Sequence, residues 1–154
     1  LELGKDDYIV IIRYYRNDYT IDNEKPKVLC IKEPKNKKTV VLGATSKPEK
    51  YAFKAISLLV EKGHSVIAIG QNAGEVAGVK IKTKAIPLKN IDTITLYLNP
   101  ARQRDYYNYI VEAKPKRVVF NPGTENPELY QLLELNGIQV EVACTLVLLT
   151  LNQY

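Results

Sequence analysis

The chain has 154 residues, of which 45% are hydrophobic and 25% are charged; these are values of an ordinary globular domain and exclude a disordered or fibrous protein. Two cysteines are too few for a disulfide scaffold, and the absence of a long apolar run or a secretory signal predicts a cytoplasmic protein that does not enter the membrane. The net charge of +5 comes entirely from residues 36–154, because residues 1–35 hold seven basic and seven acidic side chains.

The first 35 residues differ in pattern from the rest of the chain. Residues 8–15 and 26–32 have the composition of strands and flank a polar stretch at 17–25, which predicts a hairpin. An isolated hairpin is only marginally stable in water, so a poorly ordered extension is an equal alternative. We therefore expect an amino-terminal extension, residues 1–35, followed by one domain over residues 36–154.

From residue 38 onward, short apolar runs alternate with longer amphipathic segments, which is typical of parallel βαβ units. Five runs have the β-branched composition and the low polar alternation of strands that are covered on both faces. They predict an α/β fold with a Rossmann-like, doubly wound, mainly parallel five-stranded sheet and helices on both faces. The strands are expected at residues 39–42, 65–69, 93–98, 117–120 and 139–142, with a short additional strand at 79–83 and a loop at 72–78.

Three amphipathic segments between these strands are expected to be helices. Ser46 and Glu49 have the spacing of a capping box, in which the hydroxyl and the carboxylate each satisfy a backbone amide at a helix start. Apolar residues then recur at i, i+3, i+4 and i+7, which gives the helix one face to pack against the sheet. The helical segments are residues 46–62, 101–113 and 126–136.

Four loops that directly follow predicted strands are rich in small or amide-bearing residues. In an open parallel sheet, ligands bind beyond the carboxyl ends of the strands, where loops and helix N-termini converge. Any one of these loops is explained by turn chemistry alone, but four on one edge favour a binding site. The loops are residues 43–48, 70–72, 99–100 and 121–124.

The ligand class is narrowed by two motifs that are missing. The first loop, Gly43-Ala44-Thr45-Ser46-Lys47-Pro48, lacks the second and third glycines of a dinucleotide fingerprint. The second strand ends without the carboxylate that would bind ribose hydroxyls, and no phosphate-binding loop of the G-x-x-x-x-G-K type occurs. NAD is therefore disfavoured.

Several segments have an order and spacing that is specific when they are taken together. They are VVLGAT at 40–45 followed by Pro48 and Tyr51, GHSVIAI at 63–69, GEVAG at 74–78, and NGI at 136–138 with Cys144. This set resembles the small CoA-binding domain family, whose Rossmann-like fold is shared with the amino-terminal domain of the succinyl-CoA synthetase alpha subunit. Residues 121–126 are similar to those of uncharacterised bacterial members. The likeness covers about three quarters of the chain, from residue 38 onward.

The resemblance implies that CoA or an acyl-CoA is the ligand. By position, the first loop would bind the CoA phosphates through Gly43, Ala44, Thr45, Lys47, Lys50 and Tyr51. The next loops would flank the adenine and ribose through Gly70, Gln71, Asn72, Asn99 and Pro100. Many relatives have Asn-Pro where this chain has Gly70-Gln71, so the adenine contacts are expected to differ. We also expect Ser46, Asn121 and Gly123, on the same edge of the sheet, to border the ligand.

Catalytic candidates are few. His64, the one histidine, precedes the second strand and is therefore expected at the amino end of the sheet, as a surface or helix-cap residue. Cys144 follows the last strand, but a lone cysteine is more often a small buried hydrophobic residue. One histidine and two distant cysteines do not predict a metal site. The lysines of residues 80–89 are interpreted as a solvated stretch and not as a nucleic-acid groove.

We therefore expect a small stand-alone protein that binds CoA or acyl-CoA without catalysing a reaction. One alternative is an NADP-dependent oxidoreductase or a nucleotide-sugar enzyme fragment that uses the same crevice, with Lys47 or Lys50 on a phosphate. Another alternative is a regulatory interaction module whose ligand changes a contact with a partner.

Overall fold

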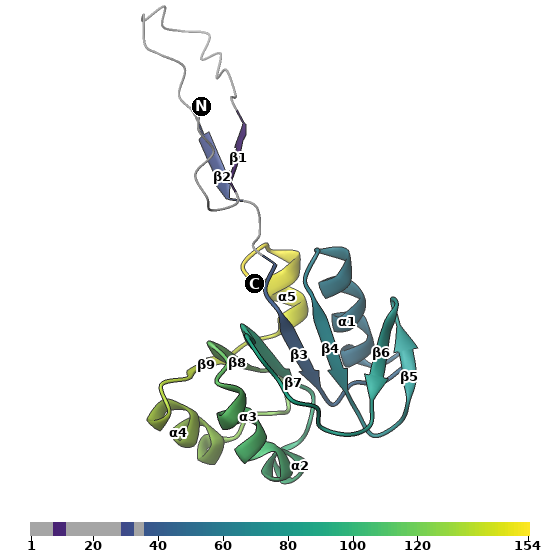
Figure 1. The fold of residues 1–154 in the computed structure, drawn as a ribbon, viewed down its shortest axis with the longest axis vertical. Helices are drawn as coiled ribbons and strands as arrows, with labels where there is room; N and C mark the ends of the chain where they lie inside the picture. The colour runs from purple at the N-terminus through teal and green to yellow at the C-terminus, as the bar shows by residue number, and fades with distance from the viewer. Residues whose placement is uncertain (1–7, 12–28, 33–35) are drawn as a thin grey trace, which may run out of the picture. The chain divides into compact units, whose positions relative to one another are not determined.

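The computed structural model describes residues 8–11, 29–32 and 36–154 (Figure 1). The chain divides into two compact units, Leu1–Lys35 and Asn36–Tyr154. In the first unit, strands β1 (Tyr8–Ile11) and β2 (Leu29–Lys32) pair antiparallel, with Tyr8 opposite Lys32. The remaining residues of the two strands predicted there, and the polar stretch between them, lie outside the described residues.

The second unit is built on one sheet in the order β5-β6-β4-β3-β7-β8-β9. Every neighbouring pair is parallel except β5 and β6. The α/β, mainly parallel, Rossmann-like sheet is confirmed, but the prediction of five strands is wrong, because this sheet has seven. The strands are β3 (Thr39–Leu42), β4 (Val66–Ile69), β5 (Gly74–Val76), β6 (Val79–Lys82), β7 (Thr93–Leu96), β8 (Arg117–Phe120) and β9 (Gln139–Val142).

The segment predicted as a loop at 72–78 instead contains strand β5, which forms a hairpin with β6. The two-residue turn between them, Ala77 and Gly78, has positive φ at both positions (49° and 82°), as in the type I′ turns that match the twist of a hairpin. Because β5 has only three residues, two of them Gly and Glu with weak strand preference, its composition did not indicate a strand.

The predicted helices are present, and there is one more. The predicted second helix is divided by a short 3-10 turn, and a helix that was not predicted follows β9. That last helix has the sequence TLVLLT, which is too short and too β-branched to show a helical period. The elements are α1 (Tyr51–Glu61), α2 (Pro100–Gln103), η1 (Arg104–Tyr106), α3 (Tyr107–Ala113), α4 (Pro127–Leu135) and α5 (Thr145–Thr150).

The capping box expected at Ser46 and Glu49 is not formed. Helix α1 begins at Tyr51, and its N-cap, Lys50, is extended and has no side-chain hydrogen bond. The residues before it make a separate turn, in which the Lys50 amide donates to the Lys47 carbonyl at 3.1 Å. This turn lengthens the loop between β3 and α1 and leaves the start of α1 without a side-chain cap.

The helices cover both faces of the sheet, as expected (Figure 1). Successive residues of a strand point to opposite faces, so β3 contributes to two cores. Val40 and Leu42 pack in the core that includes residues of α3 and α4. Val41 packs in the other core, with residues of α1 and α5. Because the strands are covered on both faces, the polar loops lie at the two ends of the sheet.

At the amino end of the sheet, His64 is buried, with 7% of its surface exposed, so the surface position, one of the two alternatives predicted for it, is wrong. The other alternative, a helix-cap residue, agrees with the structure, because the His64 amide donates to the Leu59 carbonyl at 3.0 Å at the end of α1. Its Nδ1 accepts a hydrogen bond of 3.0 Å from the Lys37 amide, and its ring lies edge-on to Tyr154 at 5.1 Å between centroids. Burial, with a smaller contribution from the Lys37 cation, lowers the pKa of His64 below its ordinary 6.5. The neutral ring is therefore the folded form near neutral pH.

This burial predicts a pH dependence of stability. Just below pH 6.5, His64 is protonated to a greater extent in the unfolded chain than in the folded protein. The free energy of unfolding should therefore fall as the pH is lowered through that value. The contribution is at most about 1.4 kcal/mol per pH unit. Urea unfolding at about pH 8 and about pH 5.5 measures this effect. Between the two pH values, the free energy of unfolding should fall less for His64→Gln than for the unsubstituted protein. Equal losses in both proteins would contradict this assignment.

Candidate ligand-binding site

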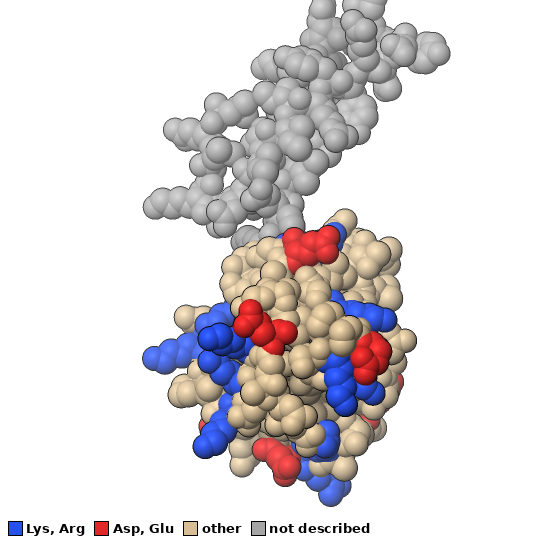
Figure 2. Space-filling model, turned by 90° about the vertical axis from the view of Figure 1, so that its right-hand side faces the viewer, with Lys and Arg blue, Asp and Glu red and all other residues tan. Residues whose placement is uncertain are grey.

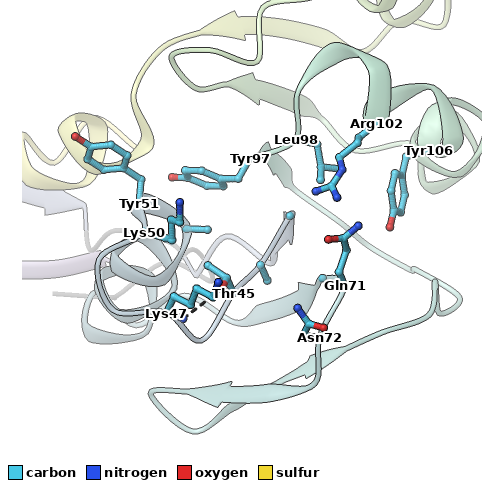
Figure 3. Close-up of a pocket in the computed structure, with 14 residues that line it drawn as sticks. Thr45, Lys47, Lys50, Tyr51, Gln71, Asn72, Tyr97, Leu98, Arg102 and Tyr106 are labelled. Carbon is cyan, nitrogen blue, oxygen red and sulfur yellow. Dashed lines mark hydrogen bonds between the residues drawn. The ribbon is translucent and has the colours of Figure 1, made fainter.

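A cavity of about 450 Å³ opens at the carboxyl ends of the central strands. The loops after β3, β4 and β7 form it, together with the start of α1 and residues of α2 and η1 (Figure 3). It brings together most of the residues expected from the first two loops. These are Gly43, Ala44, Thr45, Lys47, Lys50, Tyr51, Gly70, Gln71 and Asn72.

Two glycines allow the three loops to approach one another this closely. Gly43 has a φ of +93°, and a Cβ added there would lie 2.7 Å from the carbonyl oxygen of Tyr97. A Cβ added at Gly70 would overlap the carbonyl oxygen of Ala44. The amides of Gly43 and Ala44 both donate to the Ile69 carbonyl at 2.9 Å, which holds the first loop against the end of β4. The three loops are therefore held close together by backbone contacts.

Of the residues that the structure describes, three cationic side chains and no acidic one line the cavity; the three are those of Lys47, Lys50 and Arg102. Within the described part of the chain, none of the three forms an ion pair. Figure 3 shows Arg102 on the wall opposite the lysines, facing Gln71. The positive charges are therefore available to a ligand from both sides.

The start of helix α1 adds hydrogen-bond donors to the same cavity. The first intrahelical bond runs from the Lys54 amide to the Lys50 carbonyl, so the preceding amides of the helix have no intrahelical acceptor. Lys50 provides no side-chain cap, and both Tyr51 and Ala52 line the cavity. Free amides at the positive end of a helix favour an anion such as a phosphate.

The other predicted site residues do not line this cavity. Ser46 lies against Gly74, where a Cβ added to the glycine would come within 2.8 Å of the serine Cβ. Asn99 caps α2 by accepting from the Arg102 amide at 3.0 Å, and Pro100 is the first residue of that helix. The Gly123 amide donates to a carboxylate oxygen of Glu125 at 2.8 Å.

Asn121 is buried and its amide group is already used within the protein. Its Nδ2 donates to the Thr95 hydroxyl at 2.7 Å and to the Leu96 carbonyl at 2.9 Å. Its Oδ1 accepts from the Thr145 amide at 2.8 Å. These bonds connect the end of β8 to β7 and to the start of α5. Asn121 therefore has a structural role at this edge of the sheet.

Replacing Asn121 with alanine should destabilise the fold by about 3 kcal/mol, because three buried polar groups each lose a hydrogen bond. The matched control is Asn72→Ala, which removes the same side chain from an exposed loop position and should change stability by less than about 0.5 kcal/mol. Urea unfolding of both variants measures the difference. Similar stability of the two variants would contradict the structural role of Asn121.

The structure also places residues in the cavity that the sequence pattern did not indicate. Strand β7 ends at Leu96, two residues before the predicted end, so Tyr97 and Leu98 belong to the loop and line the cavity. Arg102 and Tyr106 reach it from the turns after β7. The signal that could have found them is their spacing of four residues, which places Arg102 and Tyr106 on one face of a helical segment.

A smaller cavity, of about 230 Å³, shares Tyr51 and Tyr97 with the first one. Its other walls are Asn121, Pro122, Cys144 and Leu146. Cys144 is a free, partly buried thiol. The hydroxyl of Tyr97 is buried without a hydrogen-bond partner among the described residues, and burial raises the pKa of this phenol, which keeps it neutral.

The described residues give less support to a metal site, a membrane span or a nucleic-acid-binding surface. In residues 8–11, 29–32 and 36–154, no group of three His, Cys, Asp or Glu side chains is placed to hold a metal ion. None of the helices in this part of the chain has the length and apolar character to cross a bilayer. Figure 2 shows one face of the molecule, on which Lys and Arg are interspersed with Asp and Glu and do not form a continuous basic surface.

A mainly parallel sheet covered on both faces, with a cationic cavity at the carboxyl ends of its strands, is the architecture of a Rossmann-like domain. Residues 37–150 match the model of a family described as CoA binding domain. The chain belongs to this family, which confirms the resemblance drawn from the sequence.

Solved structures agree with this assignment. An uncharacterised protein is 47% identical with a TM-score of 0.75, and the match covers 77% of this chain and 98% of that one. A protein described as redesigned for binding is 26% identical with a TM-score of 0.68, covering 77% and 84%. A hypothetical protein from Pyrococcus horikoshii is 28% identical with a TM-score of 0.65, covering 73% and 81%. The search of curated proteins found no match.

Proposed function

We propose that this protein binds CoA in the cavity at the carboxyl ends of the sheet and holds it without catalysing a reaction of its own. Membership of the CoA binding domain family supports the choice of ligand. The observation that carries the proposal is one cavity that, among the described residues, is lined by three cations without ion pairs and by no acidic side chain, and that contains an uncapped helix start. CoA carries a pyrophosphate and a 3′-phosphate, which need such an environment.

The two sides of the cavity suit the two anionic parts of CoA. The pyrophosphate fits the loop between β3 and α1, where Thr45, Lys47, Lys50 and the first amides of the helix offer donors. Gln71 on the opposite side carries an amide that can pair with a polar edge of the adenine. Arg102 then lies where a guanidinium can bind the 3′-phosphate, whereas the resemblance placed the CoA phosphates at the first loop.

Binding without turnover is supported by the chemistry of the lining. The described side chains around the larger cavity include no carboxylate, imidazole or thiol that would act as a general base or nucleophile. His64 lies at the other end of the sheet, beside the Lys37 amide. Incubation with acetyl-CoA should therefore release no free CoA thiol above the buffer rate. Steady release that depends on the concentration of the protein would overturn this part of the proposal.

A thermal-shift panel of CoA, acetyl-CoA, NADPH and ATP tests the choice of ligand. A ligand at about a hundred times its dissociation constant stabilises the fold by about 2.7 kcal/mol, which is a readily measured rise in melting temperature. We expect CoA and acetyl-CoA to raise the melting temperature more than NADPH or ATP at equal concentration. A shift with NADPH and none with CoA would overturn the proposal.

A further inference from the structure

The smaller cavity differs in chemistry from the larger one that it adjoins. Around the larger cavity, cations and amides dominate. Pro122, Cys144 and Leu146 form most of the wall of the smaller one, together with the tyrosines that both cavities share. In Figure 3 the hydroxyl end of Tyr97 points toward Tyr51 and away from Leu98 and Arg102, so this ring runs from the cationic cavity toward the apolar one.

The polar groups in the walls of the smaller cavity leave little for a polar ligand to bind. Both ends of the Asn121 amide are bonded to Thr95, Leu96 and Thr145. The Tyr97 hydroxyl is buried below the surface of the cavity. A polar group entering this space would lose its water and find few accessible partners, whereas an apolar group would gain from leaving water.

Two adjoining cavities of opposite chemistry fit one ligand with an anionic end and an apolar end. We propose that the smaller cavity holds the acyl chain of a medium-chain acyl-CoA whose phosphates lie in the larger cavity, with the pantetheine arm that joins them passing Tyr51 and Tyr97, which line both cavities. This inference rests on the proposed CoA binding and specifies the ligand of the same site. A cavity of about 150 Å³ holds a benzene ring, so one of about 230 Å³ has room for a chain of about eight carbons.

The first test is the dependence of affinity on chain length, measured by calorimetric titration with CoA, acetyl-, butyryl-, octanoyl- and dodecanoyl-CoA. Each fully buried methylene strengthens binding about fourfold, so even partial burial of the octanoyl chain should give a gain of at least about tenfold over acetyl-CoA. Dodecanoyl-CoA should bind no more tightly than octanoyl-CoA, because the added carbons remain outside the cavity.

A pair of variants on helix α5 locates the chain. Leu146→Trp fills the smaller cavity and should reduce the affinity for octanoyl-CoA to that for acetyl-CoA, while binding of CoA stays unchanged. The control is Val147→Trp, which adds the same bulk at the next residue of the helix, where the side chain is 51% exposed and outside the cavity. It should leave every affinity unchanged.

A second readout does not depend on whether the tryptophan variants fold. In Cys30→Ala, Cys144 is the remaining thiol of the chain, and its alkylation by iodoacetamide can be followed by mass spectrometry. Saturating octanoyl-CoA should slow this alkylation at least about tenfold, because the chain covers the sulfur. Saturating acetyl-CoA, which also lacks a free thiol, should have little effect.

The outcomes separate this inference from the proposed function. If CoA binds but chain length has no effect on affinity and octanoyl-CoA does not protect Cys144, the acyl subsite is wrong and CoA binding stands. If neither CoA nor any acyl-CoA binds, both proposals are overturned. A gain with chain length that Leu146→Trp abolishes and Val147→Trp does not is the result expected.

Discussion

Replacing Lys47 and Lys50 together with alanine should weaken CoA binding about tenfold, and adding Arg102→Ala should bring the loss to about thirtyfold or more. All three side chains line the larger cavity, and none forms an ion pair in the described part of the chain. A charge-assisted hydrogen bond contributes about 1.5 to 3 kcal/mol when it is well formed, and much less when it is exposed to solvent as here. The fold should be nearly unaffected, because the three side chains are exposed.

The matched control is Lys80→Ala with Lys84→Ala, which removes the same charge from exposed positions outside the cavity. Calorimetric titration should show nearly unchanged CoA affinity in this control. Binding to the unsubstituted protein should weaken as salt is raised, because exposed charges are screened. Equal affinities of the site variant and the control, with both folded, would place the CoA phosphates elsewhere.

Gly43→Ala should lower the free energy of unfolding by about 2 to 5 kcal/mol. The substitution has two costs. The φ of +93° is strained for any residue with a Cβ, and the added Cβ would meet the Tyr97 carbonyl oxygen at 2.7 Å. Because the obstacle is backbone, it cannot be relieved by a change of rotamer. Gly43 lines the cavity, and the fold itself also needs a glycine at this position.

Gly123→Ala separates these two costs. Gly123 has a similar φ of +89°, but an added Cβ would meet nothing within 4 Å. In this variant the free energy of unfolding should therefore fall only by the conformational cost, about 1 to 2 kcal/mol. Urea denaturation of the two variants gives the comparison. A loss at Gly43 no larger than that at Gly123 would show that the loops after β3 and β7 can separate without cost.

The central strands could be predicted because both of their faces are covered. Residues such as Val40, Val41 and Leu42 form continuous apolar runs that only a buried strand explains. Strand β5 and helix α5 lack such a signal, since one has three residues and the other has six, with β-branched side chains. Both are held by tertiary packing, β5 against β6 and α5 against α1, which a local pattern does not contain.

The candidate site could be predicted in part, for a similar reason. The rule that ligands meet the carboxyl ends of parallel strands led to the loops after β3 and β4, whose residues do line one cavity. The same rule led to Asn121, which lines the smaller cavity. Its side chain is also bonded to the Thr145 amide, and this structural role could not be predicted because Thr145 is distant in sequence. Arg102 was missed because its place in the cavity depends on where β7 ends.

The most direct test of CoA binding in this cavity is an NMR titration of the protein with CoA, followed through the assigned backbone amide resonances. We expect the amides of Gly43, Thr45, Gly70 and Gln71 to shift in proportion to the fraction bound, while those of residues 116–117 at the amino end of the sheet stay unchanged. Saturating CoA that shifts no amide at the carboxyl ends of the strands, or shifts the amino end instead, would contradict the account.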